Sequence, residues 1–148
     1  MSGSGTEVDA LQTTLAAEHA AVWLYGLLGA RTSQSAEAGL YTAVRAAYDA
    51  HRERRDALTG DIASLGASPV GSAPAYTPPA GLDTAAGRAS AALVVERSCA
   101  ETYAALVGST TGERRTRAVG MLADAAVREL SFGGEPEAFP GLPSDSLS

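Results

Sequence analysis

The sequence predicts an all-α protein, a bundle of four helices folded as one domain. The chain has 148 residues, of which 45% are hydrophobic and 5% aromatic. Alanine and leucine are prominent and β-branched runs are few, which favours helix over sheet. In four stretches the apolar residues recur at alternating spacings of three and four, which keeps them on one helix face. A chain of this length can bury a core between four such faces.

The first two predicted helices form a hairpin. The first covers residues 6–32, where Thr6 can cap the first amides and Glu7 and Asp9 favour the first turn. A short break leads to the second helix, residues 36–65, which Ser35 can cap and Gly66 ends. Because the connection is short, we expect the two helices to be antiparallel neighbours.

A proline-rich segment over residues 66–81 determines the predicted topology. Its four prolines exclude helix and are poor in strands. Extended like polyproline, roughly 15 residues reach about 46 Å, and the second helix is about 42 Å long. The segment can therefore cross the full length of the bundle, which a simple up-down hairpin would not require.

The remaining sequence predicts a second hairpin and an extended tail. The helices are expected at residues 82–107 and 113–131, joined by a short loop. From residue 132 to 148, glycines and prolines exclude regular structure. We expect this tail to lie back across the bundle through Phe132, Phe139 and Leu142, and residues 144–148 to be disordered.

Four polar side chains interrupt the apolar faces, one on each predicted helix. They are Glu18, His51, Glu96 and Glu129. An unpaired charge inside a bundle is unfavourable. These groups therefore need one another, an arginine, a proton or a metal ion.

Composition excludes several classes of protein. The net charge is −6, and the eleven basic residues, all arginine, form no basic stripe, so we expect no nucleic-acid partner. The single cysteine, Cys99, excludes an internal disulfide and suits a reducing compartment; it is expected to be a small buried hydrophobe. Residues 1–10 resemble no secretory signal, and the longest apolar stretch is about half a membrane span. We expect a soluble cytoplasmic protein without membrane contact.

Three short stretches carry a family resemblance. Residues 15–22 read Leu-Ala-Ala-Glu-His-Ala-Ala-Val, and the other two stretches are residues 50–58 and 135–141. Together with the order of helices, they resemble the ferritin-like superfamily, most closely a small actinobacterial family of ferritin-like domains of unknown function, DUF4439. The resemblance implies a ferritin-like four-helix bundle, two antiparallel hairpins joined by a long crossover.

The resemblance also implies a two-metal site that this chain carries only in part. Metal-binding members of the superfamily use a lone glutamate from each of two helices and a Glu-x-x-His pair from each of the others. Glu18 and Glu96 match the lone glutamates. The second helix keeps His51 but has a tyrosine in place of its glutamate, and the fourth keeps Glu129 but has a phenylalanine in place of its histidine. The four remaining ligands are too few to hold two irons at the usual separation.

Three interpretations of these polar residues remain: two different functions, and a wrong assignment of the helix register. In the first, the polar residues form a metal-free network with Arg55, one turn after His51, whose guanidinium can pair with two carboxylates. The domain would then be a structural or interaction module. In the second, Glu18, His51 and Glu129, with or without Glu96, hold one Fe, Mn or Zn ion in a metal-binding protein or metal-dependent oxidoreductase. The third possibility is a wrong helix register. Fold resemblance alone licenses no enzyme assignment.

The first two helices carry more apolar residues than one face can bury. Trp23, Leu24, Leu27 and Leu28 extend the apolar surface of the first helix. Such a surplus needs a cover, either the tail or another subunit. We therefore predict a homodimer formed through the first two helices, with no small-molecule ligand indicated by the sequence.

Overall fold

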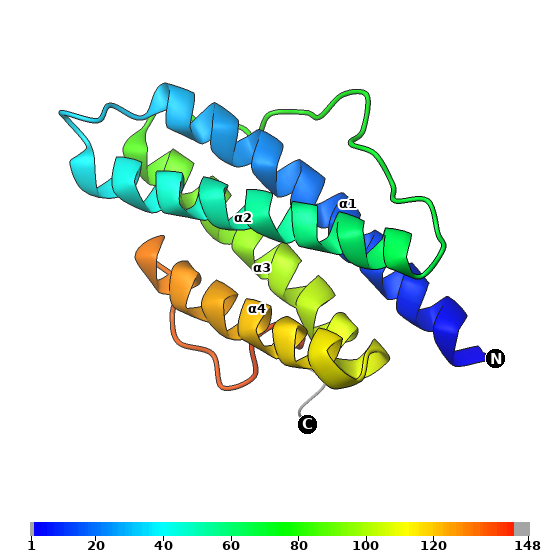
Figure 1. Cartoon of the computed structure of the whole chain (residues 1–148). Coiled ribbons are helices and arrows are strands. Elements are labelled where there is room, and N and C mark those ends of the chain that lie inside the picture. Colours follow the sequence, from blue (N-terminus) through cyan, green and yellow to red (C-terminus); the bar gives the residue numbers. More distant parts are fainter. Residues whose placement is uncertain (1, 144–148) are drawn as a thin grey trace.

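The computed structural model describes residues 2–143, with side chains from residue 5 onward, and contains four helices in this range. They are α1 (Ser2–Arg31), α2 (Ala38–Ser64), α3 (Ala85–Ser109) and α4 (Gly112–Ser131) (Figure 1). No strand occurs among the described residues, so the predicted all-α fold is confirmed. None of these helices has the length and apolar character needed to cross a membrane. The expectation for residues 144–148 lies outside the described residues.

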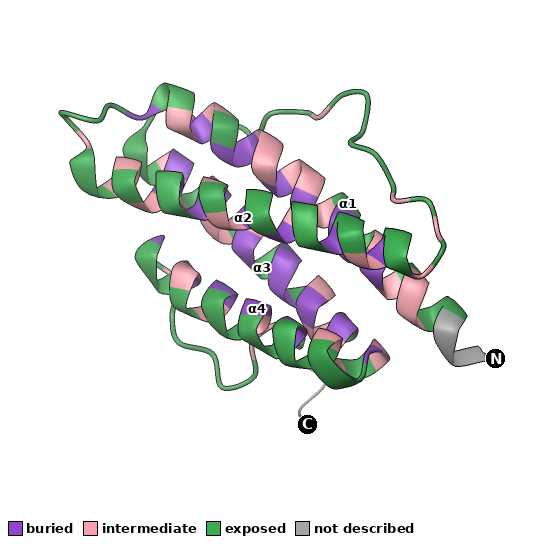
Figure 2. Cartoon of the chain, in the orientation of Figure 1, coloured by how far each residue is buried: buried purple, intermediate pink, exposed green. Residues whose placement is uncertain are grey.

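The helices pack as two hairpins joined through α1 and α3. The α1–α2 and α3–α4 pairs form the hairpins, and α1 also packs along α3. The crossover between α2 and α3 runs back along the length of the bundle, as predicted (Figure 1). Buried residues gather on the helix faces that point toward one another (Figure 2). Small, fully buried residues such as Ala21 and Ala92 allow α1 and α3 to approach closely.

The seam between α2 and α4 differs from the other three contacts, because these two helices are not in extensive backbone contact. Ion pairs bridge the seam: Arg54 of α2 lies 3.1 Å from Asp124 of α4, and Arg117 of α4 pairs with Asp61 of α2. A cavity of about 230 Å³ lies beside them. The bundle is therefore closed by apolar packing between α1 and α3 and largely by charged side chains between α2 and α4.

Glycine and threonine set several helix ends. Gly66 follows α2 with φ +78°, and the amides of Gly66 and Ala67 bond the carbonyls of Ala63 and Ile62, a Schellman ending that confirms the predicted stop. Thr84 caps α3 by accepting a bond from the Gly87 amide, so α3 starts three residues later than predicted.

Two more predicted helix starts, those of α1 and α2, were wrong in detail. α1 begins at Ser2, four residues before the expected start. The N-cap position of α2 is Glu37, which makes no side-chain cap bond, instead of Ser35. The Ser33 hydroxyl accepts the Ala36 amide just before that helix, so the break folds as a turn of its own.

The tail lies against α3, but not through the residues that were expected to anchor it. A Cβ atom on Gly141 would lie 2.3 Å from the Ala100 carbonyl oxygen, which shows how closely the tail backbone approaches α3. Phe132 is buried as predicted, whereas Phe139 and Leu142 are 54% and 49% exposed. The prediction for these two was wrong because glycine lets the backbone itself, instead of the large side chains, contact the helix.

The apolar surplus of α1 is largely covered within the chain. Leu24 and Leu28 are buried, and Trp23 packs against Tyr76 of the crossover at a ring-centroid distance of 5.3 Å. The crossover was not among the covers considered from the sequence. The apolar surface of α1 that remains for a subunit contact is therefore smaller than expected. The homodimer stays a prediction.

Candidate functional site

Three of the four predicted site residues meet in the centre of the bundle. Glu18 from α1, His51 from α2 and Glu96 from α3 are each 0% exposed. His51 Nδ1 lies 2.6 Å from Glu18 Oε2, and its Nε2 lies 2.9 Å from Glu96 Oε1. An ionised carboxylate can only accept hydrogen bonds. With both carboxylates ionised, both ring nitrogens donate, and His51 is an imidazolium held between two carboxylates.

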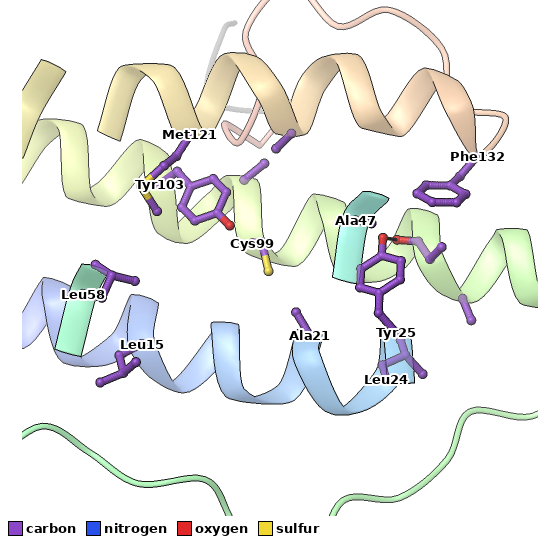
Figure 3. Close-up of a cluster of buried hydrophobic side chains, with 14 of the residues drawn as sticks. Leu15, Ala21, Leu24, Tyr25, Ala47, Leu58, Cys99, Tyr103, Met121 and Phe132 are labelled. Atoms are coloured by element: carbon purple, nitrogen blue, oxygen red, sulfur yellow. Dashed lines mark hydrogen bonds between the residues drawn. The ribbon is translucent and has the colours of Figure 1, made fainter. Parts of the chain in front are cut away.

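Two tyrosines complete the carboxylate contacts in a reciprocal way. The Tyr25 hydroxyl of α1 donates to Glu96 Oε1 of α3 at 2.6 Å, and the Tyr103 hydroxyl of α3 donates to Glu18 Oε1 of α1. Figure 3 shows the two tyrosines in the core, one from each helix. Sequence reasoning missed this role and treated both as apolar residues. The available signal was a tyrosine seven residues after the glutamate in each helix.

Two arginines extend the cluster toward α4. Arg128 Nε donates to Glu96 Oε1 at 3.1 Å. Arg54, which is 8% exposed, donates to the Tyr103 hydroxyl at 3.1 Å and lies over the ring at 5.1 Å from its centroid. A charge-assisted bond and a cation–π contact on one buried arginine fix its position at the inner end of the α2–α4 seam.

The arginine predicted to fill the core was the wrong one. Arg55 pairs with Asp56 at 2.8 Å, away from the cluster. Arg54 and Arg55 lie three and four residues after His51, and both spacings return to the same side of a helix. The buried face of α2 continues through Arg54 to Leu58, so Arg55 is turned toward the outer surface instead.

Glu129 is buried but does not join the other three residues. Its Oε2 accepts a bond from Arg97 Nε at 3.3 Å, and Arg97 also lies 3.8 Å from Glu137 of the tail. Burial raises the pKa of Glu129; the bond to Arg97 offsets part of this effect, and the nearby charge of Glu137 adds to it. Glu129 is therefore held in a separate polar contact between α3, α4 and the tail.

The electrostatics of the central cluster favour an ion pair. Burial opposes the charged form of His51, but the hydrogen bonds to Glu18 and Glu96 outweigh it and raise the pKa of the imidazole. Burial likewise opposes the charged form of Glu96, but the bond to His51 and the charge of Arg128 outweigh it and lower the pKa of that carboxyl. Each partner thus stabilises the charged form of the other.

A two-metal centre does not fit these residues. The position of one expected glutamate is Tyr48, whose ring lies beside Gly26 of α1. The position of one expected histidine is Phe132, which packs against Tyr25 at a centroid distance of 6.0 Å. An apolar ring and a phenol in these places leave each half of such a site without a ligand.

A single ion is a closer fit, but the short contacts oppose it. Donor atoms of Glu18, His51 and Cys99 lie within 4.8 Å of one another. An ion with bonds of about 2.1 Å would hold its nitrogen and oxygen ligands about 3.0–3.4 Å apart. The 2.6 Å between His51 and Glu18 is shorter than this and corresponds to a short, charge-assisted hydrogen bond. Burial, together with the charges of Glu18 and Glu96, raises the pKa of the Cys99 thiol well above its ordinary value, which disfavours the thiolate a metal needs.

Two carboxylate oxygens are the features that favour an additional ligand. Glu96 Oε2 and Glu129 Oε1 are buried and accept no hydrogen bond from the part of the chain that the structure describes. Buried acceptors are normally satisfied by protein, water or an ion.

These observations define a class: an all-helical bundle with a buried cluster of charges held by hydrogen bonds. Residues 10–144 match the model of DUF4439, a domain of unknown function, and the chain belongs to this family, as its motifs had indicated. The chain is similar to the crystal structure of a conserved hypothetical protein, Rv2844, from Mycobacterium tuberculosis, with a TM-score of 0.79 and 28% identity. The match covers 87% of this chain and 96% of that one. The comparison with curated proteins gives no match.

Proposed function

We propose that this domain is a structural or interaction module with a metal-free core. In this proposal the fold belongs to the ferritin-like superfamily, and the His51 imidazolium lies where those proteins hold metal. The observation that supports it is the pair of direct contacts from the two ring nitrogens to Glu18 and Glu96, at 2.6 and 2.9 Å. The positive charge of the imidazolium, together with Arg128, balances the two carboxylates.

The burial of the cluster also supports a structural role over catalysis. Glu18, His51 and Glu96 have no exposed surface, so a substrate has no direct access to them. The cluster instead joins α1, α2 and α3 at one point. Breaking such a buried network by removing one partner is strongly destabilising, which makes it an effective means of holding helices in one arrangement.

Metal content and histidine protonation test the proposal. Protein purified without chelator, and protein loaded anaerobically with Fe(II), Mn(II) or Zn(II), should contain no stoichiometric metal by elemental mass spectrometry. Nitrogen-15 NMR of the side chain should show both His51 nitrogens protonated. About one ion per chain, retained in the Glu53→Ala surface control and lost in Glu18→Ala, would refute it.

The alternative is a mononuclear metal site, favoured by the buried Glu96 Oε2, which accepts no hydrogen bond from the residues that the structure describes. Glu18, His51 and Glu96 would then hold one Fe, Mn or Zn ion, which would supply Lewis-acid or redox chemistry. In this case added metal raises the melting temperature of the wild type and leaves that of His51→Ala unchanged. The metal-free module predicts no rise in either protein.

Two further properties belong to the proposal. We place the protein in the cytoplasm, because its single cysteine is a buried thiol. We also infer a homodimer through α1 and α2, which keep partly buried apolar residues such as Leu27 and Leu40. Size-exclusion chromatography with light scattering should give twice the chain mass at micromolar concentration, and a monomer mass would contradict the dimer.

A further inference from the structure

A second candidate site lies beneath the crossover, on the outer face of α1 and α2. A surface pocket of about 500 Å³ separates residues 72–76 from the outer face of α1 and α2. The helix side chains that line it include His19 and Trp23 of α1 and Arg55 of α2, and Tyr76 lines it from the crossover. Its size is in the usual range for small-molecule sites. Of these residues only Arg55 was predicted to lie in the core, and in the structure it lies outside the core.

The crossover is fixed at both sides of this pocket. The Gln12 side chain donates to the Ser68 carbonyl at 2.7 Å and accepts from the Val70 amide at 2.8 Å. His19 Nε2 lies 3.0 Å from the Val70 carbonyl. Farther along, Tyr76 packs on Trp23 and its hydroxyl accepts the amide of Ala73 at 3.0 Å. These contacts hold the segment in place without pressing it onto the helices.

The residues between the two fixed points are too small to fill the space beneath them. Residues 71–75 are glycine, serine, alanine, proline and alanine, and all five are exposed. In Figure 1 the crossover arches away from the helices in this region. Proline restricts the backbone of the arch, so collapse onto α1 and α2 is disfavoured. The pocket is thus a built feature of the crossover.

The lining has the chemistry to bind an aromatic acid. Trp23 and Tyr76 form an aromatic wall, against which a planar ring can pack. Arg55 offers a guanidinium. Its Nε and Nη2 contact Asp56 Oδ1, whereas its Nη1 donates no hydrogen bond to residues 5–143. The Val70 carbonyl can only accept, so His19 Nε2 carries a proton, and in the neutral ring Nδ1 is an acceptor.

We propose that this pocket binds a small aromatic carboxylate, with its ring against Trp23 and Tyr76 and its carboxylate on Arg55. A hydroxyl on the ring would find its acceptor in His19. Asp56, whose side chain is 66% exposed, competes with the ligand for the guanidinium and turns to solvent when the ligand binds. This site goes beyond the proposed function, and neither depends on the other.

Trp23 provides the assay because it is the single tryptophan of the chain. Titration with 4-hydroxyphenylacetate should change its fluorescence in a saturable way, and equilibrium dialysis should show about one bound molecule per chain. The uncharged amide of the same probe should bind roughly tenfold more weakly or worse, the loss expected for a charge-assisted hydrogen bond. Absence of binding by both methods would overturn the proposal.

Matched variants locate the site. Arg55→Gln should weaken binding of the acid roughly tenfold or more, whereas Arg52→Gln, the same charge change on an exposed neighbour outside the pocket, should not. Asp56→Asn should strengthen binding because it removes the competing carboxylate. Equal weakening in the two arginine variants would show that the acid responds to overall charge alone and would refute the assignment. Circular dichroism checks that each variant is folded.

Discussion

Replacing His51 by alanine is the most direct perturbation of the core. The change leaves Glu18 and Glu96 facing each other without the cation that separates them, at positions with no exposed surface. Removing one partner of a buried ion pair destabilises a protein by about 3–5 kcal/mol. For a domain of this length about 1 kcal/mol lowers the melting temperature by about 3 °C. We therefore expect His51→Ala to melt about 10–15 °C lower than the wild type.

The assay is thermal and urea unfolding followed by circular dichroism at neutral pH. His19→Ala is the matched control, because His19 is the other histidine of the chain and lies partly exposed on the surface. It should cost less than about 1 kcal/mol. Adding Glu96→Gln to His51→Ala should restore part of the loss, since it removes one stranded charge. A melting temperature within about 3 °C of the wild type for His51→Ala would refute the ion-pair description.

Three other predictions concern pH, the choice of arginine and the packing of glycine. The stabilisation due to His51 should be complete below its ordinary pKa of 6.5 and be lost as pH rises through its raised pKa, so the gap between wild type and His51→Gln should narrow in alkaline buffer. Arg54→Ala should cost about 2–3 kcal/mol by urea unfolding, and Arg55→Ala about 0.5 kcal/mol or less. Gly87→Ala should cost about 2 kcal/mol or more, because its Cβ would lie 1.8 Å from a backbone carbonyl oxygen, whereas Gly60→Ala, with open space around it, should stabilise the protein by about 0.5–1 kcal/mol.

Glu96 determines how stability depends on pH on the acid side. The pKa of Glu96 is lowered, so its stabilisation is present above its ordinary pKa of 4.5 and is lost as pH falls through the lowered value. The two groups together predict greatest stability between about pH 4.5 and 6.5.

A stability difference between wild type and His51→Gln that widens above pH 7 would contradict the predicted pH dependence. Equal losses in the two arginine variants, or equal melting of the two glycine variants, would contradict the placement of those residues.

Periodicity predicted the helices and the core positions of Glu18, His51 and Glu96, because a spacing of three or four returns a side chain to the same face. The same ambiguity explains the main error. Spacings of three and four are nearly equivalent on one helix, so periodicity could not decide between Arg54 and Arg55. Only the packing of α1 against α2 and the distance to α4 separate them.

The side-chain contacts between helices could not be predicted from the sequence either. Glu129 is buried as its spacing predicted, but its partner is Arg97 of α3, which the periodicity of α4 alone does not indicate. The tail contact was predicted in outline and wrong in its anchors, since Gly141 approaches α3 through its backbone. Neither the contact of Glu129 nor the approach of Gly141 is encoded in the periodicity of one helix.

The reciprocal contacts of Tyr25 with Glu96 and of Tyr103 with Glu18 have a consequence for the order of folding. They join residues 71 and 85 positions apart, whereas each hairpin is held by contacts that are much closer in sequence. Hairpins can therefore form before the reciprocal bonds, which require both hairpins to be docked. Interactions absent from the transition state act on the unfolding rate. The cluster is thus placed to slow the separation of the two hairpins, giving the native bundle a long lifetime with little effect on how fast it forms.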